Sequence, residues 1–142
     1  MARFVNIEST KLLVRSVLLA DASVSALVGN RVWGAHFQDS DGKTVTYPMV
    51  IIDFQAGTVG SNGVYEEVSM DLYAYGRKSS GFTLELYQAC FEALQNATLR
   101  KDGIPVAGYC VETLRPLEGW NENVRAYFAQ GQYKLRISHR EL

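Results

Sequence analysis

The chain has 142 residues, of which 47% are hydrophobic and 20% charged, and its formal net charge is −1 at neutral pH. This length suits one domain, which would bury roughly 68–70% of the surface of its unfolded chain and so needs no disulfide or metal to fold. No apolar run approaches the roughly 18 residues of a membrane span, and the charge gives no reason to expect binding to a phosphate backbone. We therefore predict a soluble domain with no membrane partner and no direct sequence-specific nucleic acid binding.

The amino terminus shows two helical patterns in succession. Residues 8–20 place Leu13, Val14, Val17 and Leu18 on one face, as in a half-buried helix. Asp21 then follows as a helix N-cap, and Gly29 as a left-handed stop. Between them we expect a short helix with Val24, Leu27 and Val28 on its buried side.

Two strands are predicted after a polar connection. Residues 31–35 begin an extended segment, and residues 36–46 are polar with turn-forming Ser40, Asp41 and Gly42. The segment PMVIIDFQ, residues 48–55, reads as an inner strand. Residues 68–75 alternate between apolar and polar side chains, as a second strand does. We expect the two to form an antiparallel hairpin with a long, mobile tip from Gly57 to Glu66.

The remaining chain predicts one helix and two strands. The helix runs from about Phe82 to Leu99, and the strands occupy residues 106–116 and 123–138, with a bulge expected at Gly131. The connections around the glycine-rich turn are too short for parallel crossovers. The prediction is a single α+β domain spanning residues 1–142, with a mostly antiparallel sheet of four to five strands and helices packed on one face.

No pattern in the sequence predicts chemistry. Gly76 and Gly81 have the spacing of a phosphate-binding loop, but Phe82 and Thr83 occupy the places of its Lys and Ser or Thr. His36 and His139 lie in no nucleophile or metal pattern. We predict no catalytic residue, no metal ligand and no cofactor.

Three further groups of residues are candidates for a site. Asp39 and Asp41 lack the next oxygen ligand of a calcium loop, since Lys43 stands there. Cys90 and Cys110 have no ligand partner at metal spacing, and the start MARFVNIEST lacks the features of a secretory signal, so we expect reduced, buried thiols. Asp71 is expected to be a solvated carboxylate or a contact to a helix or neighbouring chain.

Tyrosine is unusually frequent, with eight residues. Its apolar ring and polar tip suit subunit interfaces, but strands favour aromatic residues in any case. Both interpretations stay open for the tyrosines expected on strands or at their ends: Tyr47, Tyr65, Tyr73, Tyr75, Tyr109, Tyr127 and Tyr133.

The order of these segments resembles a known family. LLADASVSALVGNRVW, residues 18–33, is similar to the amino-terminal pattern of the small tail-completion proteins, or tail terminators, of long-tailed bacteriophages. YPMVIID looks like that family's first core strand, VSMDLYAYGRKSSGFTLELYQACFEAL like its strand-to-helix unit and YKLRIS like its closing strand. Ala22 and Ser23 stand where the family often has proline after the capping Asp.

The resemblance implies a structural role without catalysis. Such proteins form a ring, with six copies the expected number, on the head-proximal end of the tail tube in the virion, after assembly in the host cytoplasm. The ring stops tube polymerisation and provides the surface for head attachment. Its expected partners are further copies of the chain, the major tail tube protein and a head-tail connector or head-completion protein.

On this hypothesis we assign two sets of contact residues. The ring interface is expected at Tyr73, Tyr75, Arg77 and Lys78. The axial contacts to the tube or connector are expected on mobile loops, which can order on binding, at Phe37, Asp39, Asp41, Val59, Asn62 and Tyr65.

Two alternatives remain from the sequence. A head-completion or neck adaptor protein of the same particle would also be small and ring-forming. A small α+β enzyme or ligand-binding domain would have only Asp71, His36 and Cys90 to act with.

Overall fold

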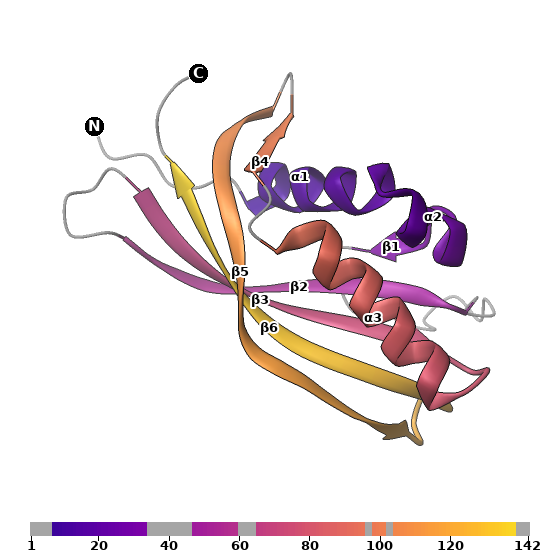
Figure 1. Ribbon diagram of the computed structural model, residues 1–142. Helices are drawn as coiled ribbons and strands as arrows, with labels where there is room; N and C mark the ends of the chain where they lie inside the picture. Colours follow the sequence, from indigo (N-terminus) through magenta and orange to yellow (C-terminus); the bar gives the residue numbers. More distant parts are fainter. Residues whose placement is uncertain (1–6, 34–46, 60–64, 96–97, 102–103, 139–142) are drawn as a thin grey trace.

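The computed structural model describes residues 7–33, 47–59, 65–95, 98–101 and 104–138. The helices are α1 (Ile7–Ala20), α2 (Ala22–Val28) and α3 (Ser80–Leu94). The strands are β1 (Val32–Trp33), β2 (Met49–Val59), β3 (Tyr65–Gly76), β4 (Thr98–Lys101), β5 (Ile104–Asn121) and β6 (Ala126–Ser138). The three helices cover one face of a single twisted sheet (Figure 1), which confirms the predicted α+β class.

The sheet has the strand order β1-β2-β3-β6-β5-β4. All neighbours run antiparallel except β1, which pairs in parallel with β2 through Val32 opposite Val50. The predicted hairpin of β2 and β3 is confirmed. The described sheet has six strands rather than four to five, because residues 98–101 form β4.

The predicted bounds of the third helix were wrong at both ends. α3 begins at Ser80 because the Ser79 hydroxyl oxygen caps it, accepting from the amide of Phe82 at 3.0 Å. It ends at Leu94, because Gln95 has extended backbone and bridges to Cys110 of β5. Pairing of β4 with β5 therefore overrides the helical pattern of residues 95–99.

The turn between β2 and β3 is shorter than predicted. β2 continues to Val59 and β3 starts at Tyr65, so both ends of the expected tip belong to the ladder. The pairing register shifts between Phe54 and Gly57, which places an irregularity in β2 at the end of the predicted strand, just before the expected tip.

The predicted bulge at Gly131 was also wrong. β6 pairs with β3 without interruption through Leu72 opposite Gly131, and the irregularities lie in β5, between Glu112 and Leu117. Gly131 has a different role, because the aromatic ring of Tyr87 from α3 lies directly above it. A Cβ built on Gly131 would overlap the Tyr87 hydroxyl and stand 2.6 Å from its Cζ.

The corner between α1 and β1 confirms the predicted caps. Asp21 Oδ1 accepts from the amides of Ser23 and Val24 at 3.0 and 3.1 Å, and Gly29 has φ 62°. Arg15 of α1 donates from Nε to the carbonyl of Val32 at 2.8 Å. The corner is thus tied to the first helix as well as to the sheet.

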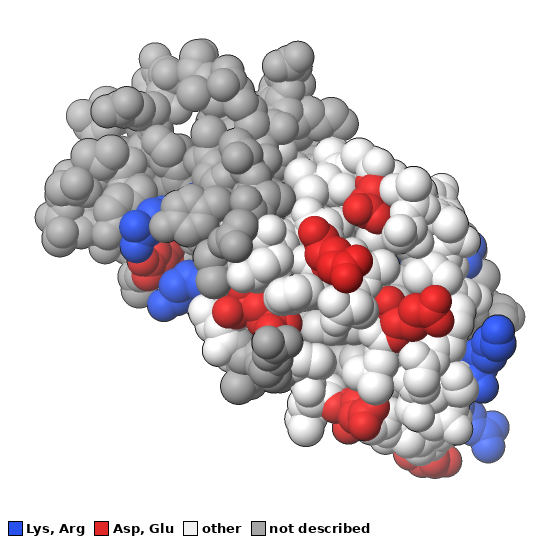
Figure 2. Space-filling view, viewed as in Figure 1, with Lys and Arg blue, Asp and Glu red and all other residues white. Residues whose placement is uncertain are grey.

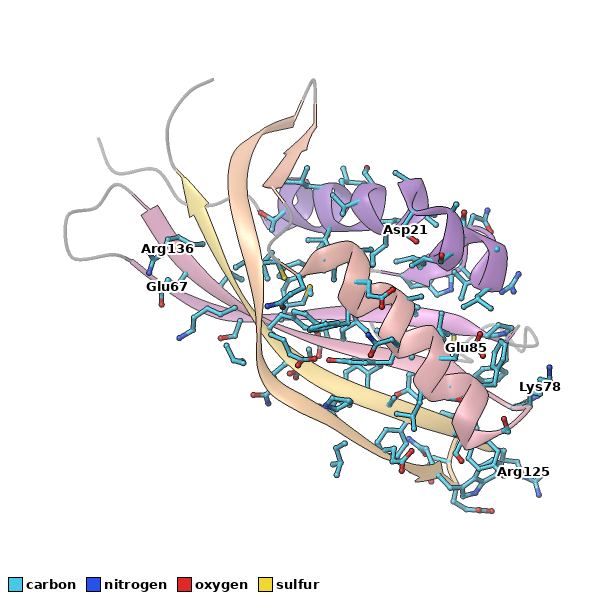
Figure 3. All side chains as sticks on the ribbon, viewed as in Figure 1. Asp21, Glu67, Lys78, Glu85, Arg125 and Arg136 are labelled. Atoms are coloured by element: carbon cyan, nitrogen blue, oxygen red, sulfur yellow. The ribbon has the colours of Figure 1, made fainter. Side chains whose placement is uncertain are left out.

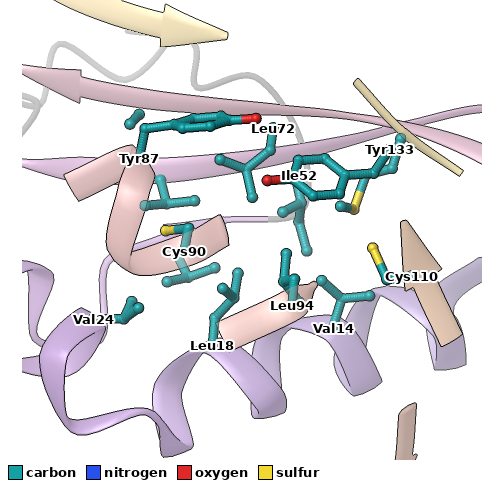
Figure 4. Close-up of a cluster of buried hydrophobic side chains, with 14 of the residues drawn as sticks. Val14, Leu18, Val24, Ile52, Leu72, Tyr87, Cys90, Leu94, Cys110 and Tyr133 are labelled. Carbon is teal, nitrogen blue, oxygen red and sulfur yellow. The ribbon is translucent and has the colours of Figure 1, made fainter. Parts of the chain in front are cut away.

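The main core lies between the helices and the sheet (Figure 4). Leu13, Val14 and Leu18 of α1 pack with Leu86, Cys90 and Leu94 of α3 over Ile52, Leu72 and Leu135 of the sheet, and all are fully buried. None of the helices in the described residues is both long and apolar enough to cross a membrane.

Candidate interaction surfaces

The sheet face away from the helices, here called the open sheet face, is the first candidate surface. It carries a second hydrophobic cluster to which none of the described helices contributes. Met49, Ile51, Tyr75 and Ala126 form its buried centre, and Tyr47, Tyr73, Val124 and Phe128 pack around them. Strand register explains this grouping, since Met49, Tyr75 and Phe128 lie opposite one another across β2, β3 and β6.

Farther along the central strands, the open sheet face carries polar side chains. Asp53 and Asp71 lie opposite each other, and Asp71 faces Gln132 on β6. Farther along, Glu67 forms salt bridges with Arg136 at 2.9 Å and Lys134 at 3.5 Å (Figure 3). The hydrogen bond from Arg136 lowers the pKa of Glu67. The open sheet face therefore passes from an aromatic half to a charged half along the strands.

Two of the predicted ring-interface residues belong to the aromatic half. Tyr73 and Tyr75 stack with ring centroids 5.9 Å apart. Tyr75 is only 5% exposed, and burial raises its pKa to about 12, whereas Tyr73 is half-buried. Tyr73 therefore offers more surface to a partner than Tyr75 does.

Arg77, the third predicted ring-interface residue, is held by contacts within the chain. Its guanidinium lies 4.4 Å from the centroid of the Tyr47 ring and donates to the carbonyls of Arg125 at 3.1 Å and Val124 at 3.4 Å. Tyr47 also donates to Val124 at 3.2 Å. Arg77 thus joins the β3–α3 turn to the β5–β6 turn.

The basic tip is the surface formed where these two turns meet. We define it by Lys78 and Arg125, which are labelled in Figure 3, and by Trp120 near the end of β5. Lys78 and Arg125 are exposed, and Trp120 is 46% exposed. The Trp120 ring packs edge-on against the Tyr127 ring, with the two ring centroids 4.9 Å apart. The Trp120 Nε1 donates to the Glu122 carboxylate at 2.7 Å. The indole is therefore fixed in place while exposed, as interface aromatics are.

Sequence reasoning missed Trp120 and Arg125. The tryptophan lies in the polar segment EGWNENVR. A large aromatic residue in such a turn-like segment could have indicated an exposed contact residue. Arg125 has φ 53°, a conformation that few residues other than glycine adopt and that composition does not reveal.

The acidic helix face is the third surface, defined by Glu85 and Glu92 on the outer side of α3 and Asp21 beside it. Both glutamates are exposed, and Asp21 is close enough to Cys90 to contribute to the raised pKa of that thiol. Carboxylates are scattered over this side of the molecule, while Lys and Arg gather at its two ends (Figure 2). The basic residues visible in this view therefore lie at the ends, with carboxylates beside them, whereas the helix side carries carboxylates.

The predicted axial residues divide into two groups. Val59 and Tyr65 lie in β2 and β3, opposite Glu66 and Ser138. Phe37, Asp39, Asp41 and Asn62 lie outside the described residues.

The residues that an enzyme would have needed do not converge. Asp71 belongs to the open sheet face, whereas Cys90 is fully buried on the helix side, so the sheet separates the two. His36 and His139 lie outside the described residues. Among the described residues, no group of three or more His, Cys, Asp or Glu side chains could hold a metal ion.

Both thiols are expected to be unreactive in the folded protein. Cys90 and Cys110 are fully buried, and burial raises the pKa of each to about 12. Titration with a thiol reagent at pH 8 should label neither cysteine in the native state and both in guanidinium chloride. Rapid labelling of one thiol without denaturant would contradict the packing of α3 on the sheet.

Comparison with known proteins finds similarity in structure alone. No family model and no curated protein sequence matches the chain. Among solved structures, a chain in the virion of a native gene transfer agent particle matches with a TM-score of 0.69 and 20% identity, over 96% of this chain and 99% of that one. The chain therefore shares its overall fold with that chain of the gene transfer agent virion. Bacteriophage SPP1 gp17 matches with a TM-score of 0.54 and 20% identity, over 96% of this chain and 94% of that one.

Proposed function

We propose that this protein is a structural component of a phage-like particle, which forms a ring at the head-proximal end of the tail. The ring caps the tail tube, stops its polymerisation and presents the surface to which the head attaches. The observation that carries the proposal is the fold shared, over nearly the whole of both chains, with a chain of a gene transfer agent virion. The segment order that resembles tail terminators supports the same role.

The distribution of surfaces suits a ring. Head-to-tail contacts close into a ring only if each copy offers two unlike, complementary patches. This chain carries an acidic helix face and a basic tip, which are different surfaces of opposite charge. The open sheet face, half aromatic and half charged, adds a surface for a different contact.

The proposal predicts self-association that tail tubes promote. Analytical ultracentrifugation of the purified chain at micromolar concentration, alone and with assembled tail tubes, should show a closed oligomer, with six copies expected. The protein should also stop the growth of tubes from their subunits. A chain that stays monomeric in both conditions and leaves tube length unchanged would contradict the proposal.

A further inference from the structure

We propose that the contact between neighbouring copies joins the basic tip of one copy to the acidic helix face of the next. This inference rests on the proposed ring and names the surfaces that close it. A second copy of this chain thus binds the outer face of α3 through its basic tip, which is cationic and aromatic.

Glu85 and Glu92, on the acidic side of this contact, take part in none of the salt bridges among the described residues. The salt bridges among the described residues are both made by Glu67, on the other face of the sheet. Glu85 and Glu92 are exposed and lie seven positions apart on α3, with exposed Gln88 between them. Gln88 donates to Glu92 at 3.2 Å, which leaves the negative charge in place. The outer face of α3 is therefore a hydrated, anionic strip.

The basic side combines charge with a rigid apolar anchor. Lys78 and Arg125 are exposed on two turns that Arg77 holds together. Glu122 accepts from the indole of Trp120 and keeps its negative charge. The exposed Arg77, Lys78 and Arg125 on the two turns, however, outnumber it. The tip thus presents positive charge around a fixed aromatic ring, and residues of this kind dominate binding energy in interfaces.

Geometry favours a head-to-tail contact over a symmetric pair. The tip lies at the end of the molecule where α3 begins, and the acidic helix face lies along the side of α3 (Figure 3). Two tips placed together, or two α3 faces placed together, would bring like charges into contact, which disfavours a symmetric pair. A tip placed on a neighbour's α3 face brings opposite charges together. It leaves a free tip on one end copy and a free acidic helix face on the other, and these two surfaces can join to close a ring.

The test exchanges the charges of the two surfaces. In variant A the tip is reversed by Lys78→Glu and Arg125→Glu, and in variant B the helix face is reversed by Glu85→Lys and Glu92→Lys. Each variant alone should associate at least tenfold more weakly than the wild type, because like charges then meet at every contact. An equimolar mixture of A and B should recover assembly in rings that alternate the two variants. Native mass spectrometry distinguishes such rings by their composition.

The control is Lys134→Glu, which changes an exposed lysine on the charged half of the open sheet face and should assemble like the wild type. Unchanged melting temperatures and thiol protection in A and B show that each variant is folded. If A or B assembles as strongly as the wild type, or if the mixture assembles no more strongly than either variant alone, the proposed contact is wrong. That result would not contradict the ring itself. A wild-type chain that remains monomeric alone and with tubes overturns the ring, and the contact with it.

Discussion

Replacing Gly131 with alanine is expected to lower the free energy of unfolding by about 2–5 kcal/mol. The added methyl group would overlap the Tyr87 hydroxyl and stand 2.6 Å from Cζ and 2.9 Å from Cε2. Tyr87 is 3% exposed, and its hydroxyl donates to Glu112 at 2.5 Å, so the ring cannot move aside without losing that hydrogen bond. The added methyl group would therefore destabilise the packing of α3 against the centre of the sheet.

Thermal and urea unfolding measure this loss, and two further variants isolate its cause. Gly81→Ala is the matched control, because its Cβ would meet nothing closer than 3.9 Å, and alanine in a helix is favoured over glycine by about 1 kcal/mol. Tyr87→Phe removes the atom with the worst overlap, so it should cost less in the Gly131→Ala background than in the wild type. Equal stability of the wild type and Gly131→Ala would show that Tyr87 does not lie against the strand.

Replacing Leu72 with alanine is expected to cost about 2–5 kcal/mol. Leu72 is fully buried on β3, opposite Ile52 on one side and Gly131 on the other, and packs under the helices. The matched control is Leu117→Ala on β5, where the leucine is 64% exposed and the expected change is within about 0.5 kcal/mol.

Denaturant midpoints of the two variants give the comparison directly. A loss at Leu117 as large as that at Leu72 would mean that the open sheet face is buried as deeply as the face under the helices. The assignment of one covered and one open face would then be wrong.

Local signals were read correctly from the sequence where a single residue determines the backbone. Asp21 as a cap and Gly29 as a stop depend only on nearby amides and on one φ angle, and the structure has both. The alternation of residues 68–75 likewise fixed which side chains of β3 face the helices. Such features require no knowledge of distant residues.

The failures occur where distant segments decide the outcome. Residues 98–101 continue a helical pattern, yet they pair with β5 because that hairpin satisfies their amides. A bulge is predicted at Gly131, but a glycine stands there because the ring of Tyr87 leaves no room for a side chain. Tyr87 lies 44 positions earlier in the chain. No local pattern contains this information.

The candidate surfaces were predictable only in part. Lys78 lies on an exposed turn, as a basic run before a helix indicates, whereas Arg77 in the same run is held by Tyr47 and by carbonyls of the β5–β6 turn. Trp120 and Arg125 join Lys78 only through the pairing of β5 with β6 and of β6 with β3. The separation of charge between helix side and tip is therefore a property of the fold.

The central claim is the position of this protein at the head-proximal end of a tail, and electron microscopy of separated particles tests it most directly. Free tails and free filled heads, purified from particles that carry an epitope-tagged copy of the chain, would be labelled with a gold-conjugated antibody. We predict gold at one end of the free tails, at the end that joins the head, and none on free heads. Label on the heads would instead make the protein a neck adaptor, and label along the tube or on neither particle would contradict a role in ending the tail.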